Sequence, residues 1–233
     1  MKIHELKTFL QQYEIKCFDE QLNLLNAFMK CTLATNEKFN LTAITNEDHF
    51  VEKMIFDSAL ALYDLDIANK KIIDIGTGAG YPGMVLKILE PNADMVLLDS
   101  TAKKIAYLNE FASSNKINVQ GIVARAEDYA RNNVEKFDYA TARAVATLNI
   151  LLELIIPLLK VGGTFIAMKG AGYEQEILDS QKALKKLNCR IESIEEFELP
   201  ESKEFRAIIR IVKEKPTNKK YPRQYNEIKK LPL

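Results

Sequence analysis

A glycine-rich segment, Asp74-Ile-Gly-Thr-Gly-Ala-Gly-Tyr-Pro-Gly83, contains the residues whose types and spacing most clearly indicate chemistry. Gly76, Gly78 and Gly80 allow a tight turn and a close approach of the backbone to a ligand. A helix expected to start at Gly83 would add unpaired backbone N–H groups. Asp99 ends the next apolar run, where a carboxylate can accept hydrogen bonds from ribose hydroxyls. The segment therefore predicts a cleft for a ribose-bearing cofactor.

The acidic residue before the first glycine, Asp74, helps to distinguish between two classes of cofactor. A dinucleotide would place a pyrophosphate against the loop and the helix N-terminus. Asp74 would repel such a group at short range, whereas it would attract a cationic ammonium. The pattern therefore disfavours an NAD-dependent oxidoreductase, for which the chain also has no plausible hydride-transfer constellation. NAD remains the alternative cofactor.

The elements that must hold this loop follow an α/β pattern. From Lys71 onward, short apolar or β-branched runs alternate with amphipathic stretches, which indicates a parallel sheet with helices on both faces. Two final strands, Arg190–Leu199 and Phe205–Lys213, have a short connection and are expected to be antiparallel neighbours. The other strands are expected at Lys71–Ile75, Met95–Leu98, Val119–Val123, Tyr139–Thr141 and Thr164–Met168, and helices at Gly83–Leu89, Ala102–Ser114, Ala126–Asn132, Leu148–Leu159 and Tyr173–Leu187.

Three regions are expected along the chain. Residues 1–70 have apolar residues at three- and four-residue spacing and form a helical N-terminal extension. Residues 71–213 form the Rossmann-like cofactor-binding domain. Residues 214–233 form a basic tail with three prolines, expected to be loop-like. The chain has no net charge, but residues 201–233 hold ten Lys and Arg against four Asp and Glu, which is consistent with a contact to a polyanion.

Composition excludes several classes of protein. A hydrophobic content of 47% excludes a chain that is disordered throughout. Three widely spaced cysteines exclude a disulfide framework and a cysteine zinc knuckle, and no metal site is expected. The N-terminus has no apolar core of a signal peptide, and no apolar run reaches the ~20 residues of a membrane span. These features predict a cytoplasmic protein that does not contact a membrane.

Several short motifs resemble known families. The Asp-x-Gly-x-Gly-x-Gly pattern resembles motif I of class I S-adenosylmethionine-dependent methyltransferases. From about Asn36 to the C-terminus, the chain resembles the bacterial 16S rRNA guanine-N7 methyltransferase family, also called RsmG or glucose-inhibited division protein B. The motifs that carry this resemblance are Asn40-Leu-Thr-Ala-Ile, Phe56-Asp-Ser, Asp74–Gly83, Leu98-Asp-Ser, Arg125-Ala-Glu-Asp, Thr141-Ala-Arg-Ala-Val-Ala, Pro157-Leu-Leu-Lys, Lys169-Gly and Tyr221-Pro-Arg.

The resemblance implies a fold, a cofactor and a set of contacts. The fold is a Rossmann-like class I methyltransferase domain, α/β, with a mostly parallel seven-stranded sheet, an antiparallel C-terminal strand and a helical N-terminal extension. The cofactor is S-adenosylmethionine, with Asp74 facing its ammonium group and Arg143 next to the target-base pocket. The expected cofactor-binding residues are Asp74, Gly76, Gly78, Gly80, Tyr81, Asp99, Ala126, Glu127 and Arg143.

The implied reaction is methyl transfer to N7 of a guanine in 16S rRNA. That nitrogen carries no proton at neutral pH, so no general base is needed, no catalytic proton-transfer residue is expected, and catalysis rests on positioning, with Arg143 as a positioning residue. The implied partner is 16S rRNA within the small ribosomal subunit, bound by a monomer. RNA contacts are expected from Arg143, Lys169, Arg223, Lys229 and Lys230, with Tyr221 stacking on a base.

Two other interpretations remain open at this point. The same fold could methylate a small molecule or a protein, because fold does not determine substrate. A non-catalytic module that senses a nucleotide or binds RNA would bind the cofactor without transferring its methyl group.

Overall fold

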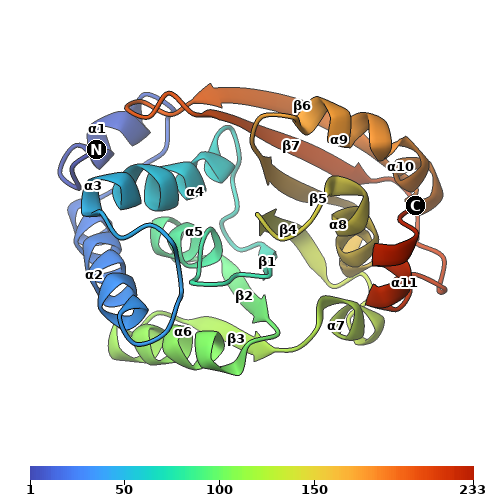
Figure 1. Cartoon of the computed structure of the whole chain (residues 1–233), viewed down its shortest axis with the longest axis horizontal. Coiled ribbons are helices and arrows are strands. Elements are labelled where there is room, and N and C mark those ends of the chain that lie inside the picture. The colour runs from blue at the N-terminus through green and yellow to red at the C-terminus, as the bar shows by residue number, and fades with distance from the viewer.

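The computed structural model describes residues 1–233, in which seven strands form one sheet (Figure 1). The strand order is β3-β2-β1-β4-β5-β7-β6. The first five strands are parallel, and β7 lies antiparallel between β5 and β6. The strands are β1 (Lys71–Ile75), β2 (Asp94–Asp99), β3 (Val119–Val123), β4 (Phe137–Arg143), β5 (Leu159–Lys169), β6 (Cys189–Glu198) and β7 (Phe205–Lys213).

Helices cover both faces of this sheet (Figure 1). One face packs against the N-terminal helices together with α5 and α6, and the other packs against α8, α10 and α11. The helices are α1 (Leu6–Gln11), α2 (Asp19–Asn36), α3 (Glu47–Phe50), α4 (Asp57–Ala59), α5 (Gly83–Leu89), α6 (Ala102–Ser114), α7 (Ala126–Asn132), α8 (Leu148–Ile155), α9 (Tyr173–Asp179), α10 (Gln181–Leu187) and α11 (Tyr225–Lys230).

Burial on both faces explains the continuous apolar runs of the central strands. Along β1, Ile72 packs into one hydrophobic cluster, whereas Ile73 and Ile75 pack into the other. Neighbours on a strand point to opposite faces, so a strand between two helical layers is apolar at nearly every position. The predicted α/β fold with its helical N-terminal extension and antiparallel last strands is confirmed.

The expected single helix at Leu148–Leu159 is wrong. Helix α8 ends at Ile155 and a 3₁₀ turn follows at Ile156–Leu158, because Pro157 cannot continue the α-helical hydrogen bonding. Leu159 already belongs to β5.

The expected helix at Tyr173–Leu187 is two helices, α9 and α10, which meet at Ser180. The Ser180 hydroxyl is buried and donates to the carbonyl oxygen of Glu176 at 2.6 Å. A side chain that bonds to the backbone in this way competes with regular helix formation.

The expected loop at the C-terminus is also wrong. Helix α11 occupies Tyr225–Lys230, and Tyr221, Ile228 and Leu233 are buried in the same hydrophobic cluster as α8 and α10. The apolar residues of this segment are spaced too widely for helical periodicity to be visible, so their burial depends on the surface against which they pack. No helix of the structure is long and apolar enough to cross a bilayer.

Candidate functional site

A cleft of about 1020 Å³ lies where the loops after the parallel strands β1, β2, β3, β4 and β5 come together. Open α/β sheets bind ligands at this edge, outside the carboxyl ends of the strands. Side chains from α4, β7 and α11 complete the walls. The sheet thus gathers segments that are far apart in the sequence around one ligand-sized space.

The glycine loop forms one wall of this cleft. Its three expected glycines have positive φ angles, 66° at Gly76, 58° at Gly78 and 95° at Gly80. A Cβ atom at Gly76 would lie 2.7 Å from Cγ2 of Val145, so only glycine lets the loop after β4 approach this closely. A Cβ atom at Gly78 would meet no atom closer than 3.8 Å, and Gly78 lines the cleft.

Most N–H groups of this loop already have acceptors inside the protein. The Gly78 amide donates to Oδ2 of Asp99 at 3.0 Å, and the Gly80 amide donates to the Thr77 carbonyl at 2.8 Å. The Gly83 amide donates to Oδ2 of Asp74 at 2.9 Å. A loop that cradles a pyrophosphate needs such amides free to face the phosphates. This arrangement therefore argues against a dinucleotide.

Asp74 lies beneath the loop and is fully buried. One of its oxygens accepts from the Gly83 amide, and the other accepts from the Thr141 hydroxyl at 2.9 Å. Burial raises the pKa of this carboxyl from 3.8 to about 6, against the opposing effect of these hydrogen bonds. The expectation that Asp74 faces the ligand is wrong: Asp74 holds the loop to β4 and does not line the cleft.

Replacing Asp74 by asparagine is expected to make the protein more stable at pH 8. The raised pKa means that the folded state binds this proton more tightly than the unfolded state does. The resulting stabilisation is complete below about pH 4 and is lost as the pH rises through 6. A neutral amide of the same shape avoids the burial of a charge, so we expect a gain of about 1–3 kcal/mol in the free energy of unfolding.

The check is urea denaturation of both proteins from pH 4 to 8. The advantage of Asp74→Asn should shrink towards pH 4. A gain that is independent of pH would show that Asp74 does not titrate in this range.

The other acidic residues of the expected set, Asp99 and Glu127, lie at or just after the ends of the neighbouring strands β2 and β3. Asp99 ends β2, lines the cleft, and accepts from the amides of Gly78 and Thr101. Ala126 and Glu127 start α7 directly after the β3 loop, and both line the cleft. Glu127 is buried and pairs with Nε of Arg125 at 3.3 Å. These carboxylates stand where a nucleoside's hydroxyl and amino groups would find acceptors.

Arg143 ends β4 and lines the cleft, as expected. Its Nη1 donates to the carbonyl oxygen of Lys53 at 2.9 Å and lies 3.4 Å from Oδ2 of Asp57. Asp57 is buried, and it also accepts from Nε of Arg206 at 3.0 Å. The N-terminal extension thus holds Arg143 in place through two of its groups.

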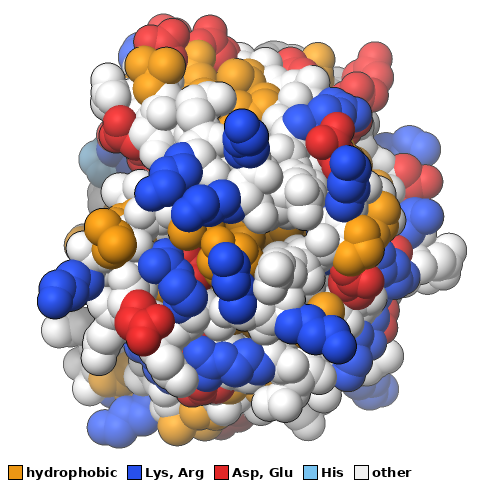
Figure 2. Space-filling view, turned by 90° about the vertical axis from the view of Figure 1, so that its right-hand side faces the viewer, with side chains coloured by type: hydrophobic (Ala, Val, Ile, Leu, Met, Phe, Trp, Pro, Cys, Tyr) orange, Lys and Arg blue, Asp and Glu red, His pale blue; other side chains and the backbone are white.

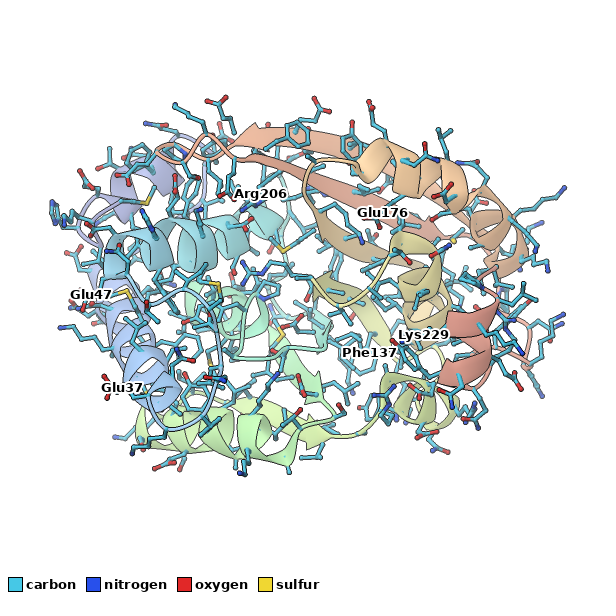
Figure 3. All side chains as sticks on the ribbon, in the orientation of Figure 1. Glu37, Glu47, Phe137, Glu176, Arg206 and Lys229 are labelled. Atoms are coloured by element: carbon cyan, nitrogen blue, oxygen red, sulfur yellow. The ribbon has the colours of Figure 1, made fainter.

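Four charged residues of this wall were not predicted from the sequence as site residues. Lys53 pairs with Glu204, Glu204 pairs with Arg206, and Arg206 pairs with Asp57. Figure 3 shows Arg206 on β7 next to α4. The segment Val51–Phe56, which contains Lys53, is a π-helical stretch, a form often found at functional sites. The Phe56-Asp-Ser motif was the only signal in the sequence for this cluster.

Tyr81 touches the cleft, but its ring points into the N-terminal helical layer. The ring stacks on Phe28 of α2 with centroids 4.9 Å apart, and its hydroxyl lies 3.1 Å from the Thr32 hydroxyl. Burial raises the pKa of Tyr81 well above its usual value, so this hydroxyl stays neutral. Tyr81 therefore fastens the glycine loop to α2.

The expected RNA-binding residues fall into two groups. Lys230 is exposed on α11, as is Lys229. Lys169 and Arg223 instead have partners within the protein. Nζ of Lys169 donates to Glu176 at 2.7 Å, and both side chains line the cleft; Figure 3 labels Glu176 beneath α9.

Arg223 forms a bidentate salt bridge with Glu153 of α8. Nε lies 2.8 Å and Nη2 2.6 Å from the two oxygens of this fully buried carboxylate. Tyr221, expected to stack on a base, is buried in the core. Tyr225 lines the cleft instead, with the Arg125 guanidinium 4.6 Å from the centre of its ring. Tyr225 went unnoticed because nothing in the sequence places the C-terminal segment at the cleft.

The charges of the cleft are largely paired. Every basic side chain that lines it, except Lys104, contacts an acidic neighbour. The cleft therefore presents mainly fixed, oriented charge pairs, with Lys104 as its one unpaired cation, and further free cations for a polyanion must come from elsewhere on the surface.

Comparison with known families gives one match over most of the chain. The family described as rRNA small subunit methyltransferase G (GidB) matches residues 21–205. The protein named ribosomal RNA small subunit methyltransferase G of Desulfitobacterium hafniense (strain Y51) is 42% identical over 226 residues, which cover 96% of this chain and 94% of that protein. The protein of the same name from Bacillus cytotoxicus is 38% identical over 237 residues, covering 100% and 99%.

Solved structures of low identity share the fold. TYW2 of M. jannaschii, determined in complex with AdoMet, is 17% identical with a TM-score of 0.58, covering 73% of this chain and 79% of that one. A TehB-like SAM-dependent methyltransferase from Corynebacterium glutamicum is 18% identical with a TM-score of 0.54, covering 79% and 98%. These likenesses concern the sheet and its helices.

Proposed function

The chain belongs to the rRNA small subunit methyltransferase G family, and from this premise we propose that it transfers the methyl group of S-adenosylmethionine to N7 of a guanine in 16S rRNA. The observation that carries the proposal is the cleft itself. Most amides of its glycine loop are satisfied internally, and two acidic side chains follow the neighbouring strands, Asp99 at the end of β2 and Glu127 in the first turn of α7 after β3. This donor and acceptor set fits a cationic nucleoside cofactor and does not fit a pyrophosphate.

Each part of the cofactor has matching groups in the cleft. Asp99 would accept hydrogen bonds from the ribose hydroxyls, and the backbone of Ala126 with the Glu127 carboxylate would hold the adenine. Gly76 and Gly78 would allow the amino-acid end to approach the backbone. Arg143 would bind its carboxylate. The ionised Asp74 beneath the loop would favour the nearby ammonium through the field of its charge.

The bound cofactor supplies an activated methyl group on a sulfonium centre. Guanine N7 has a free lone pair and no proton at neutral pH, so the protein has no proton to remove. The task of its residues is to hold the guanine in line with the methyl group and to exclude water. Methylation leaves a positive charge on the base. Glu176 and Glu204, which line the cleft within charge pairs, would favour that charge.

The proposal also covers the form of the RNA substrate, the oligomeric state of the protein and its location. The names of the relatives place their action on small-subunit ribosomal RNA. We propose that this chain acts as a monomer in the cytoplasm on the assembled small subunit. A chain without net charge attracts bare RNA weakly, whereas a folded particle offers both shape and phosphates.

Transfer of labelled methyl from S-adenosylmethionine tests the proposal. The acceptors are small subunits that lack the modification, the same 16S rRNA stripped of protein, and an unrelated structured RNA. We expect label on the subunits, in a fraction that RNase destroys. RNase-resistant label would indicate a protein acceptor. Absence of label on all RNA acceptors, with cofactor binding demonstrated by a raised melting temperature, would contradict the proposed function.

A further inference from the structure

Eight lysines gather on the side of the molecule formed by α10, α11 and the segment that joins β7 to α11, here named the C-terminal lysine face. All eight are exposed, and none of them forms an ion pair. Figure 2 shows this side, with Lys and Arg side chains spread across it and fewer Asp and Glu between them. The face consists of Lys182, Lys185, Lys186, Lys215, Lys219, Lys220, Lys229 and Lys230.

The concentration of charge is local. Residues 181–189 contain no acidic residue, and residues 215–233 contain only Glu227, although the whole chain has as many acidic as basic residues. The two segments are joined in space, because the Glu214 amide donates to the Asn188 carbonyl at 2.8 Å and the Asn188 side chain donates to the Pro216 carbonyl at 3.2 Å. The end of α10 and the start of the segment after β7 therefore lie side by side.

Helix α11 links this face to the cleft. Its first residue, Tyr225, lines the cleft, whereas Lys229 and Lys230 at its other end belong to the face; Figure 3 labels Lys229. The helix is six residues long, about 9 Å at 1.5 Å per residue. Arg223 fixes the start of this segment to α8 through Glu153. Lys185, Lys186 and Lys215 adjoin the paired residues Cys189 and Lys213, at the edge of the sheet where β5 begins and opposite the cleft. An RNA bound to the face would therefore reach the cleft along α11.

We propose that the C-terminal lysine face binds the phosphate backbone of the RNA that carries the target guanine. This inference rests on the proposed function and adds to it the surface that positions the substrate. Unpaired, exposed lysines act as point charges for phosphates, whereas the paired cations of the cleft do not. Phosphate contacts fix the register of an RNA without reading its sequence, and they weaken steeply with salt. A partner with isolated acidic side chains would not need a surface of this extent.

The test compares two variants with the same change in charge. K185Q/K186Q/K229Q/K230Q removes four cations from the face. The matched control, K16Q/K30Q/K38Q/K70Q, removes four exposed, unpaired lysines located elsewhere. Glutamine and lysine have similar helix propensities, so neither variant should lose stability. RNA affinity is measured by fluorescence anisotropy with a 16S rRNA fragment at several salt concentrations, separately from methyl transfer.

For the face variant we expect RNA affinity to fall about tenfold or more, and the slope of log K against log salt to flatten by about 3. The control should bind like the wild type, and both variants should bind S-adenosylmethionine like the wild type. Equal RNA affinities and equal salt slopes for the two variants would overturn the inference. So would a loss seen only with intact subunits and not with stripped rRNA, because the face would then contact a ribosomal protein.

The inference and the proposed function fail in different ways. A wild-type protein that binds RNA through the face but transfers no methyl group to 16S rRNA would overturn the function alone. A wild-type protein that methylates 16S rRNA, with a face variant that is equally active and binds RNA equally well, would overturn the inference alone.

Discussion

Replacing Arg223 by alanine is expected to lower the free energy of unfolding by about 3–5 kcal/mol, because the change leaves the Glu153 carboxylate buried without its counter-charge. Glu153 is fully buried on α8, and both of its oxygens are held by the Arg223 guanidinium. The lost contact would also release the C-terminal segment that places Tyr225 at the cleft. The measurement is chemical denaturation of purified wild type and variant at pH 7.

A second substitution separates the charge from the rest of the contact. In the double variant R223A/E153Q the buried group is neutral, and its oxygen can still accept from the backbone amide of residue 223, which lies 2.9 Å away in the wild type. We expect this variant to recover about half of the lost stability. If Arg223 serves only to bind RNA, R223A would keep the wild-type stability and would raise only the KM for the RNA acceptor.

Replacing Arg143 by alanine is expected to weaken binding of S-adenosylmethionine about tenfold to a hundredfold and to lower the rate of methyl transfer further. A hydrogen bond to a charged group contributes about 1.5–3 kcal/mol. The variant should fold, because Asp57 keeps its contact with Arg206. Affinity is measured by calorimetry and the rate by single-turnover methyl transfer at saturating cofactor.

Two further variants serve as controls for the effect of R143A on cofactor affinity and rate. R190A removes an exposed arginine on β6, at the edge of the sheet away from the cleft, and should leave affinity and rate unchanged. R143K keeps the charge without the guanidinium fork and should fall between wild type and R143A. An R143A protein with normal affinity and rate but reduced stability would show that Arg143 serves only to tie the Lys53 carbonyl and Asp57 to β4.

Local sequence determined the central sheet well enough to predict it. The strands β1 and β2 are short apolar runs whose burial on two faces makes them visible without any knowledge of their partners. The edge strand β3 is only partly buried, and its β-branched residues with the following polar segment indicated it. The glycine loop, Asp99, Glu127 and Arg143 were predicted from their places at or just after strand ends. All of the expected cofactor-binding residues line the cleft except Asp74 and Gly80, and Gly80 packs against Leu108 and Phe28 instead.

The features that the sequence did not predict depend on contacts between residues far apart in the chain. The contact of Asp57 with Arg206 joins residues 149 positions apart, and the contact of Glu153 with Arg223 joins residues 70 apart. Neither arginine differs in its sequence surroundings from an exposed one. Arg223 therefore looked like an RNA contact, and the helix at Tyr225–Lys230 looked like a loop, because the partner surface of α8 is visible only in the folded protein.

Identifying the methylated nucleoside decides whether the chemistry proposed for the cleft is correct. Small subunits lacking the modification are incubated with the protein and methyl-labelled S-adenosylmethionine, and their 16S rRNA is digested to nucleosides and separated. We expect the label in N7-methylguanosine, at one position, with R143A giving much less. Label in a nucleoside whose acceptor atom must first lose a proton would contradict a cleft that acts by positioning alone, and label confined to ribosomal protein would contradict the RNA substrate.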